Sequence, residues 1–78
     1  MITFILYSRP GCHLCELLTE ELEPLVRGRA QIRHVDVSQD VDLEQRYGLR
    51  IPVLVTDGME LSGYPLDRDR VGRYLASL

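Results

Sequence analysis

The hydrophobic pattern changes its period abruptly near the start of the chain, at the turn formed by Pro10 and Gly11. Before the turn, Ile2–Tyr7 is a short, nearly all-apolar run rich in β-forming residues, which is typical of a strand buried on both faces. After it, leucines recur at helical spacing from Leu14 to Leu25, with glutamates on the other side. The chain therefore begins with a strand, a tight turn and an amphipathic helix.

Two signals mark the end of this first helix. Arg27 and Gly28 supply a cationic last turn and a helix stop. Pro24 has no backbone N–H to donate, so we expect regular hydrogen bonding to kink or end near Glu20–Glu23.

Strand and helix signals alternate through the rest of the chain. The predicted elements are a strand at Gln31–Val37, a helix from Asp40 or Val41 to Tyr47 stopped by Gly48, strands at Pro52–Thr56 and Met59–Ser62, and a helix capped by Asp67. Asp57-Gly58 between the last two strands is the strongest hairpin signal in the sequence. Tyr47 and Tyr74 are expected in the core.

This order, β-α-β-α-β-β-α, predicts the architecture. Two strands joined through a helix are parallel with a right-handed crossover, whereas the hairpin strands are antiparallel. We expect an α/β fold, a four-stranded mixed sheet with helices on both faces, formed by residues 1–78 as a single domain. A chain of 78 residues is too short for a two-domain dinucleotide enzyme, a TIM barrel or a kinase.

Composition and charge limit the classes of partner that the chain is expected to bind. A net charge of −3 and a pI near 5.2 argue against nucleic acid, since phosphate contacts need clustered cations. No apolar stretch approaches the length of about 18 residues that a membrane span needs. The first residues show neither a basic region nor a small-residue cleavage site, so we expect a cytoplasmic monomer without a signal peptide.

Cys12 and Cys15 are the only cysteines, and they form Cys-x-x-Cys. Two cysteines are too few for the disulfide framework of a secreted mini-protein, and too few for a four-ligand zinc site without well-placed histidines. Between a strand and a helix of a βαβ pattern, this spacing indicates a redox dithiol.

The position of the pair indicates different roles for its members. Cys12 falls at the start of the helix, where free N–H groups and the helix dipole favour the nucleophilic thiolate. Cys15 lies one helical turn further on, which brings the two sulfurs within bonding range. Cys15 can therefore attack a mixed disulfide on Cys12 and release the substrate.

The segment from Tyr7 to Cys15 resembles the active-site segment of glutaredoxins, in which a cation, here Arg9, also lies three residues before the first cysteine. Ile51-Pro52 before a strand is similar to the thioredoxin superfamily, to which glutaredoxins belong. The resemblance covers essentially the whole chain. It implies a thioredoxin-like fold and a thiol–disulfide oxidoreductase in which Cys12 is the nucleophile and Cys15 the resolving cysteine. It also implies that Pro52 is a cis-proline facing the dithiol, where the Ile51 backbone would pair with an extended substrate segment.

The sequence departs from glutaredoxins at several positions. His13-Leu14 stands between the cysteines in place of Pro-Tyr, and Leu6 stands where thioredoxins place a buried aspartate. One glycine, Gly63, stands where glutaredoxins have two. Gly63 followed by Tyr64 is more similar to the small glutaredoxin-like redoxins that reduce ribonucleotide reductase with electrons from thioredoxin reductase.

These departures leave two electron donors open: glutathione, or a flavoprotein of the thioredoxin-reductase type. We expect no bound cofactor, and partners limited to a disulfide-containing protein substrate or glutathione and a reductase. Arg9 and Arg50 are candidates for attracting a carboxylate-bearing thiol or an acidic protein surface. Tyr7 and Tyr64 are candidates for lining the cleft.

Two histidines keep alternatives open. His13 is either an imidazolium that stabilises the thiolate or an exposed polar residue. His34, on a predicted strand, favours a structural or solvent role. A binding module that uses Cys12 and Cys15 for a metal or an iron–sulfur cluster is the alternative to the enzyme, although the expected metal site is none.

Overall fold

The computed structural model describes all of residues 1–78 and contains one four-stranded sheet in the order β2-β1-β3-β4. The elements are β1 (Ile2–Ser8), α1 (His13–Val26), β2 (Ala30–Asp36), the 3₁₀ helix η1 (Val37–Gln39), α2 (Val41–Tyr47), β3 (Val53–Thr56), β4 (Met59–Ser62) and α3 (Arg68–Ala76). β1 pairs parallel with β2 and antiparallel with β3, and β3 pairs antiparallel with β4. The α/β fold with a mixed sheet is therefore confirmed.

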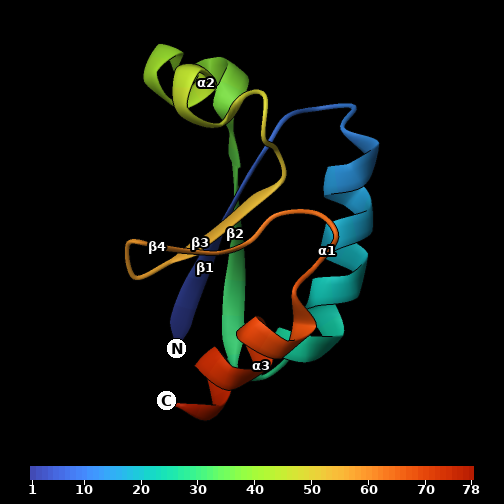
Figure 1. The fold of residues 1–78 in the computed structure, drawn as a ribbon, viewed down its shortest axis with the longest axis vertical. Coiled ribbons are helices and arrows are strands. Elements are labelled where there is room, and N and C mark those ends of the chain that lie inside the picture. Colours follow the sequence, from blue (N-terminus) through green and yellow to red (C-terminus); the bar gives the residue numbers. More distant parts are fainter.

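Figure 1 shows how the helices surround the sheet. α1 runs along one side of it, α2 lies at the end where β1 and β2 finish, and α3 lies at the opposite end near both termini. None of these helices is long and apolar enough to cross a membrane.

Most of the apolar interior lies on one face of the sheet, in a cluster that we call the main core. Phe4 and Leu6 point to this face from β1, and the opposing strand contributes Leu54. The cluster also contains the buried side of α1 and α3: Leu18, Leu22, Val26, Val71 and Leu75. In α1 the buried positions recur every three or four residues, as an amphipathic helix requires.

The other face carries a smaller group of buried residues, which we call the α2 cluster: Val37, Tyr47, Val53 and Val55. Tyr7, which alternates with Leu6 along β1, packs against it. Helices therefore cover both faces of the sheet, but α2 covers its face with only a few buried side chains.

Several boundaries differ from the expected ones. α1 continues through Pro24 to Val26, so the helix does not end near Glu20–Glu23. Pro24 lies in the last turn and removes a single donor, while the next bond, from the Arg27 N–H to the Glu23 carbonyl at 3.1 Å, still forms. The third strand begins at Val53 rather than Pro52.

The second strand begins one residue early and ends at Asp36, because a 3₁₀ turn follows it. The Asp36 carboxylate accepts hydrogen bonds from the Ser38 hydroxyl at 2.6 Å and the Ser38 N–H at 2.9 Å. These bonds cap the turn and hold the pKa of the Asp36 carboxyl below its usual range.

The hairpin and the two later helices form as expected. Asp57 and Gly58 have φ values of 52° and 74°, the left-handed conformations that a two-residue hairpin turn of this kind needs. Asp40 caps α2, accepting from the Asp42 N–H at 2.9 Å. Asp67 caps α3, accepting from the Arg70 N–H at 3.0 Å.

Candidate active site

A short loop carries the chain from the end of β1 to the start of α1 and places Cys12 at the helix terminus. Gly11 has φ 79°, a conformation that residues with a side chain rarely adopt. The Cys12 N–H donates to the Arg9 carbonyl at 3.3 Å, which closes the turn. Cys12 is thereby the N-cap of α1.

Cys12 and Cys15 form a disulfide, with their Cα atoms 5.2 Å apart. The Cys15 N–H donates to Cys12 Sγ at 3.1 Å, so a free donor of the helix terminus points at this sulfur. Cys15 is only 5% exposed, whereas Cys12 is half-buried. A substrate thiol or disulfide therefore reaches Cys12 more readily than Cys15.

Pro52 and Gly63 lie together, although they come from different loops. Pro52 is buried, and the Ile51–Pro52 peptide bond is cis, as the resemblance implies. A β-carbon on Gly63 would lie 3.6 Å from the Pro52 carbonyl oxygen. The Tyr64–Pro65 bond is also cis, which nothing in the sequence indicated.

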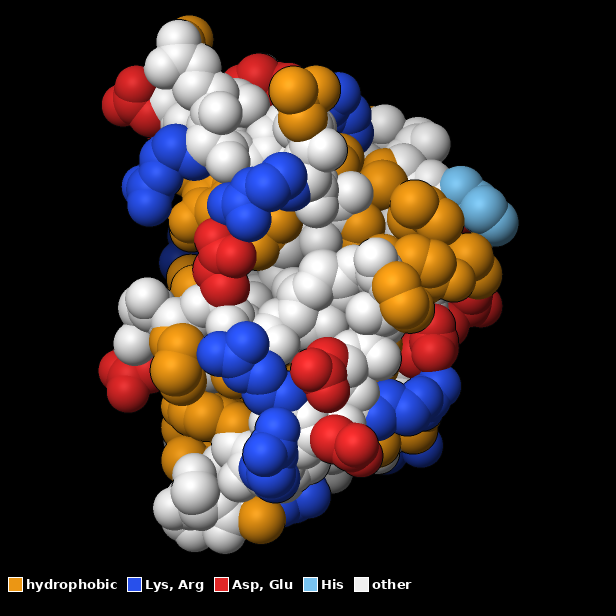
Figure 2. Space-filling view, viewed as in Figure 1, with side chains coloured by type: hydrophobic (Ala, Val, Ile, Leu, Met, Phe, Trp, Pro, Cys, Tyr) orange, Lys and Arg blue, Asp and Glu red, His pale blue; other side chains and the backbone are white.

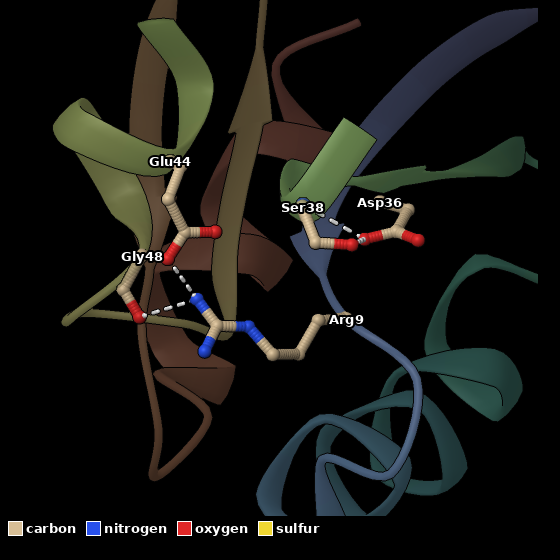
Figure 3. Close-up of polar contacts among 5 residues, drawn as sticks. All are labelled: Arg9, Asp36, Ser38, Glu44 and Gly48. Atoms are coloured by element: carbon tan, nitrogen blue, oxygen red, sulfur yellow. Dashed lines mark hydrogen bonds and ion pairs between the residues drawn. The ribbon is translucent and has the colours of Figure 1, made fainter. Parts of the chain in front are cut away.

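Arg9 points toward Glu44 and Gly48 and ties the loop before Cys12 to α2 (Figure 3). Its guanidinium forms an ion pair with Glu44 and donates to the Gly48 carbonyl at 3.3 Å. Gly48 is buried beside this contact, and a β-carbon there would collide with Glu44. Residue 48 is therefore a glycine for two reasons. It ends α2, and its lack of a side chain leaves room for Glu44.

Arg50 is held in a similar way by Glu60 on β4. Two guanidinium nitrogens donate to the two carboxylate oxygens at 2.8 and 3.1 Å, and the guanidinium lies 5.4 Å from the centre of the Tyr47 ring. The paired guanidinium holds the pKa of the Glu60 carboxyl below its usual range. Both arginines expected to attract substrate are thus paired with carboxylates of the chain. Neither Glu44 nor Glu60 was singled out from the sequence.

The remaining candidates divide between surface and interior. His13 is exposed, with Nδ1 3.8 Å from a carboxylate oxygen of Glu16. Tyr64 and Leu14 are exposed, and hydrophobic side chains gather over the amino-terminal part of α1 (Figure 2). The expectation that Tyr7 lines the cleft is wrong, because its ring stacks on Tyr47 with centroids 4.3 Å apart.

No group of three or more His, Cys, Asp or Glu side chains is placed to hold a metal ion. His34 lies on β2, exposed and away from any ion pair.

A Cys-x-x-Cys pair at the amino terminus of α1, in a protein whose four-stranded mixed sheet has the order β2-β1-β3-β4, defines a thioredoxin-like fold. The Glutaredoxin-like domain family (DUF836) matches residues 3–76, so the chain belongs to this family.

Solved structures agree with this assignment. The crystal structure of structural genomics target protein XcR50 from X. campestris is 36% identical, with 96% of this chain and 97% of that chain covered and a TM-score of 0.75. The solution structure of the same target is 37% identical, with 100% and 96% covered and a TM-score of 0.74. A malarial protein, 16% identical over 80% of this chain and 76% of its own with a TM-score of 0.52, shares the fold. No curated protein matches the sequence.

Proposed function

We propose that the protein is a thiol–disulfide oxidoreductase in which Cys12 attacks a substrate disulfide and Cys15 resolves the mixed disulfide. The family and the Cys-x-x-Cys pair fit a redox role. The observation that carries the finer proposal is the asymmetry between the two sulfurs. Cys12 is accessible and accepts a hydrogen bond from the Cys15 N–H, whereas Cys15 is buried.

This asymmetry determines the order of events. A thiolate on Cys12 keeps the hydrogen bond from the helix terminus and is favoured by the helix dipole. It attacks one sulfur of the substrate disulfide, and the other sulfur leaves as a thiol. Cys15 then attacks Cys12, so that the substrate gains two electrons and the pair becomes a disulfide.

Trapping of the intermediate tests this proposal. Cys15→Ser is expected to accumulate a mixed disulfide on Cys12 when incubated with oxidised glutathione or a disulfide peptide. Cys12→Ser is expected to accumulate none on Cys15 within the same time, because that sulfur is buried. Mass spectrometry of the adducts measures both. Equal labelling of the two variants would contradict the assignment.

We infer that a flavoprotein of the thioredoxin-reductase type, rather than glutathione, reduces the pair. Glutathione requires cations for its carboxylates, but Arg9 and Arg50 already form ion pairs with Glu44 and Glu60. Leu14, between the two cysteines, and Tyr64, after Gly63, are exposed apolar side chains, and such side chains suit a protein surface better than a small charged peptide.

Coupled NADPH-oxidation assays with each reducing system test the donor. Turnover is expected to be faster with the flavoprotein than with glutathione and its reductase at physiological concentrations. Fast turnover with glutathione alone would reverse this order. Tyr64→Gly, which bares the backbone after Gly63, is expected to raise the glutathione rate.

A further inference from the structure

A cleft opens beside the disulfide. Its volume is about 320 Å³, and its lining comes from the loop after β1, the first two turns of α1 and the edge strand β2. Cys15 and His34 both line it. His34 pairs with Leu6 in the sheet register, so it points to the same face as Leu6, on the α1 side of the sheet.

Resolution of the mixed disulfide, which rests on the proposed function, requires Cys15 to lose its proton. Cys15 is 5% exposed, and burial disfavours a thiolate. The donor at the helix terminus, the Cys15 N–H itself, points at Cys12. Cys15 therefore needs a proton acceptor that the helix does not provide.

The cleft contains few groups that can accept this proton. The titratable and charged groups that line the cleft with His34 are Cys15 and Glu16 from α1, Cys12 at its start, and Arg9 from the loop. Asp36, two residues further along β2, shares the face of His34, but its carboxylate accepts hydrogen bonds from Ser38. Arg9 is a cation paired with Glu44 and accepts nothing. Thr19 donates its hydroxyl proton to the Cys15 carbonyl at 2.9 Å.

Glu16 is a weaker candidate than His34. Its side chain is 70% exposed and faces His13, and a solvated carboxylate is too weak a base to take a proton from a thiol. An imidazole changes its charge between about pH 5 and 8 and accepts a proton while neutral. No ion pair fixes His34 in its charged form.

We propose that His34 is the proton acceptor for the resolving cysteine, reached from Cys15 through water in the shared cleft. The Cys15 proton passes to the imidazole, and the thiolate attacks Cys12 Sγ of the mixed disulfide. The Cys12–Cys15 bond forms as the bond from Cys12 to the substrate sulfur breaks. The leaving thiolate takes a proton from the imidazolium or from water, which returns His34 to its neutral form.

Reaction of the reduced protein with the aromatic disulfide dithiobis(nitrobenzoate) separates the two steps. Attack by Cys12 releases one coloured thiolate, and resolution by Cys15 releases a second, so stopped-flow absorbance shows two phases. His34→Asn is expected to leave the first phase unchanged and to slow the second at least about tenfold near neutral pH.

The pH profile distinguishes proton transfer from a structural role. In the wild-type protein the second phase is expected to accelerate at a lower pH than in His34→Asn, in which the Cys15 thiol has to ionise without the imidazole. Free imidazole is expected to restore the second phase in His34→Ala, because the cleft is open to solvent.

Two controls complete the experiment. Arg33→Gln changes the neighbouring residue on β2, which points to the opposite face, and is expected to leave both phases unchanged. A second phase that is the same in wild type and His34→Asn across the pH range, or one slowed instead by Glu16→Gln, would overturn the assignment of His34. Release of a single thiolate by the wild-type protein would contradict the proposed function itself.

Discussion

The main core and the α2 cluster lie on opposite faces of one sheet and hold different parts of the candidate site. The main core is apolar and anchors α1, whose buried side carries Cys15 toward the interior. The α2 cluster has few buried residues, and polar and aromatic contacts join it to the loops on either side. Arg9 ties it to the loop before Cys12, and Arg50 ties the loop before Ile51 to β4.

This difference suggests that the two regions contribute differently to stability and to the geometry of the site. The free energy gained by burying apolar side chains is proportional to the area removed from water. The main core buries the most side chains, so it supplies most of the favourable free energy of folding. Exposed ion pairs supply little. However, they fix the loop that carries Cys12 and the loop before Pro52, so the α2 cluster is expected to influence disulfide exchange more than stability.

The largest expected effect is that of a cavity in the main core. Leu22→Ala removes a side chain with no exposed surface, and the free energy of unfolding is expected to fall by about 3 kcal/mol. Below the unfolding midpoint, the rate of exchange at Cys12 is expected to stay within a factor of about two of the wild-type rate. Urea titration and the first phase of the dithiobis(nitrobenzoate) reaction measure the two quantities.

Leu75→Ala, on α3, is the matched variant distant from the dithiol. A slow exchange in Leu22→Ala alone would show that the main core also sets the site.

A smaller loss of stability is expected from the α2 cluster. Tyr47→Leu keeps an apolar side chain but removes the stack on Tyr7 and the aromatic ring beneath Arg46 and Arg50. The free energy of unfolding is expected to fall by about 1 kcal/mol. Because the Arg50 guanidinium lies 5.4 Å from the centre of the Tyr47 ring, the substitution also removes a side-chain contact that holds the loop before Pro52. Exchange with a protein substrate is therefore expected to slow more than in Leu22→Ala. The reverse order would remove the distinction between the two regions.

The sequence predicted the main core better than the α2 cluster, for a physical reason. Helical spacing of leucines and a run of β-formers specify the main core locally, and the Cys-x-x-Cys pair lies where the two patterns meet. The α2 cluster depends on contacts that no local pattern encodes. Arg9 and Glu44 are 35 residues apart, and their pairing follows from the position of α2 over the end of β1.

The position of Tyr7 is another feature that no local sequence pattern encodes. An all-apolar strand indicates burial on both faces, but it does not say which helix covers each face. Only the register, with Tyr7 opposite Val53 and Leu6 opposite Leu54, places Tyr7 against the α2 cluster and Leu6 in the main core. His34 is similar, since its cleft forms from segments that are distant in the sequence.

The ion pair between Arg9 and Glu44 offers a finer test of the difference between the main core and the α2 cluster. Glu44→Gln and Arg9→Gln are each expected to lower the free energy of unfolding by less than about 1 kcal/mol. Only one of the two substitutions is expected to raise the rate of exchange. Glu44→Gln leaves the Arg9 cation free, so reduction by glutathione, an anion, is expected to quicken about twofold to fivefold, and the gain should fade at high salt. Arg9→Gln is expected to give no such gain. Identical rates in the two variants would show that Arg9 acts only as a tether.

The smallest expected effect is the pH dependence contributed by Glu60. Its pair with Arg50 holds the pKa of the folded-state carboxyl below the ordinary value of 4.5. The folded state therefore binds this proton less readily than the unfolded state, and the pair stabilises the protein at pH values above 4.5. That contribution is lost as the pH falls through the lowered folded-state pKa. Glu60→Gln should accordingly have a lower urea midpoint than wild type at pH 7, and the difference should shrink as the solution is acidified.

The matched control is Asp42→Asn, which changes an exposed carboxylate on α2 that forms no ion pair. A gap between wild type and Glu60→Gln that stays constant with pH would mean that Glu60 acts through packing on β4 and not through its charge.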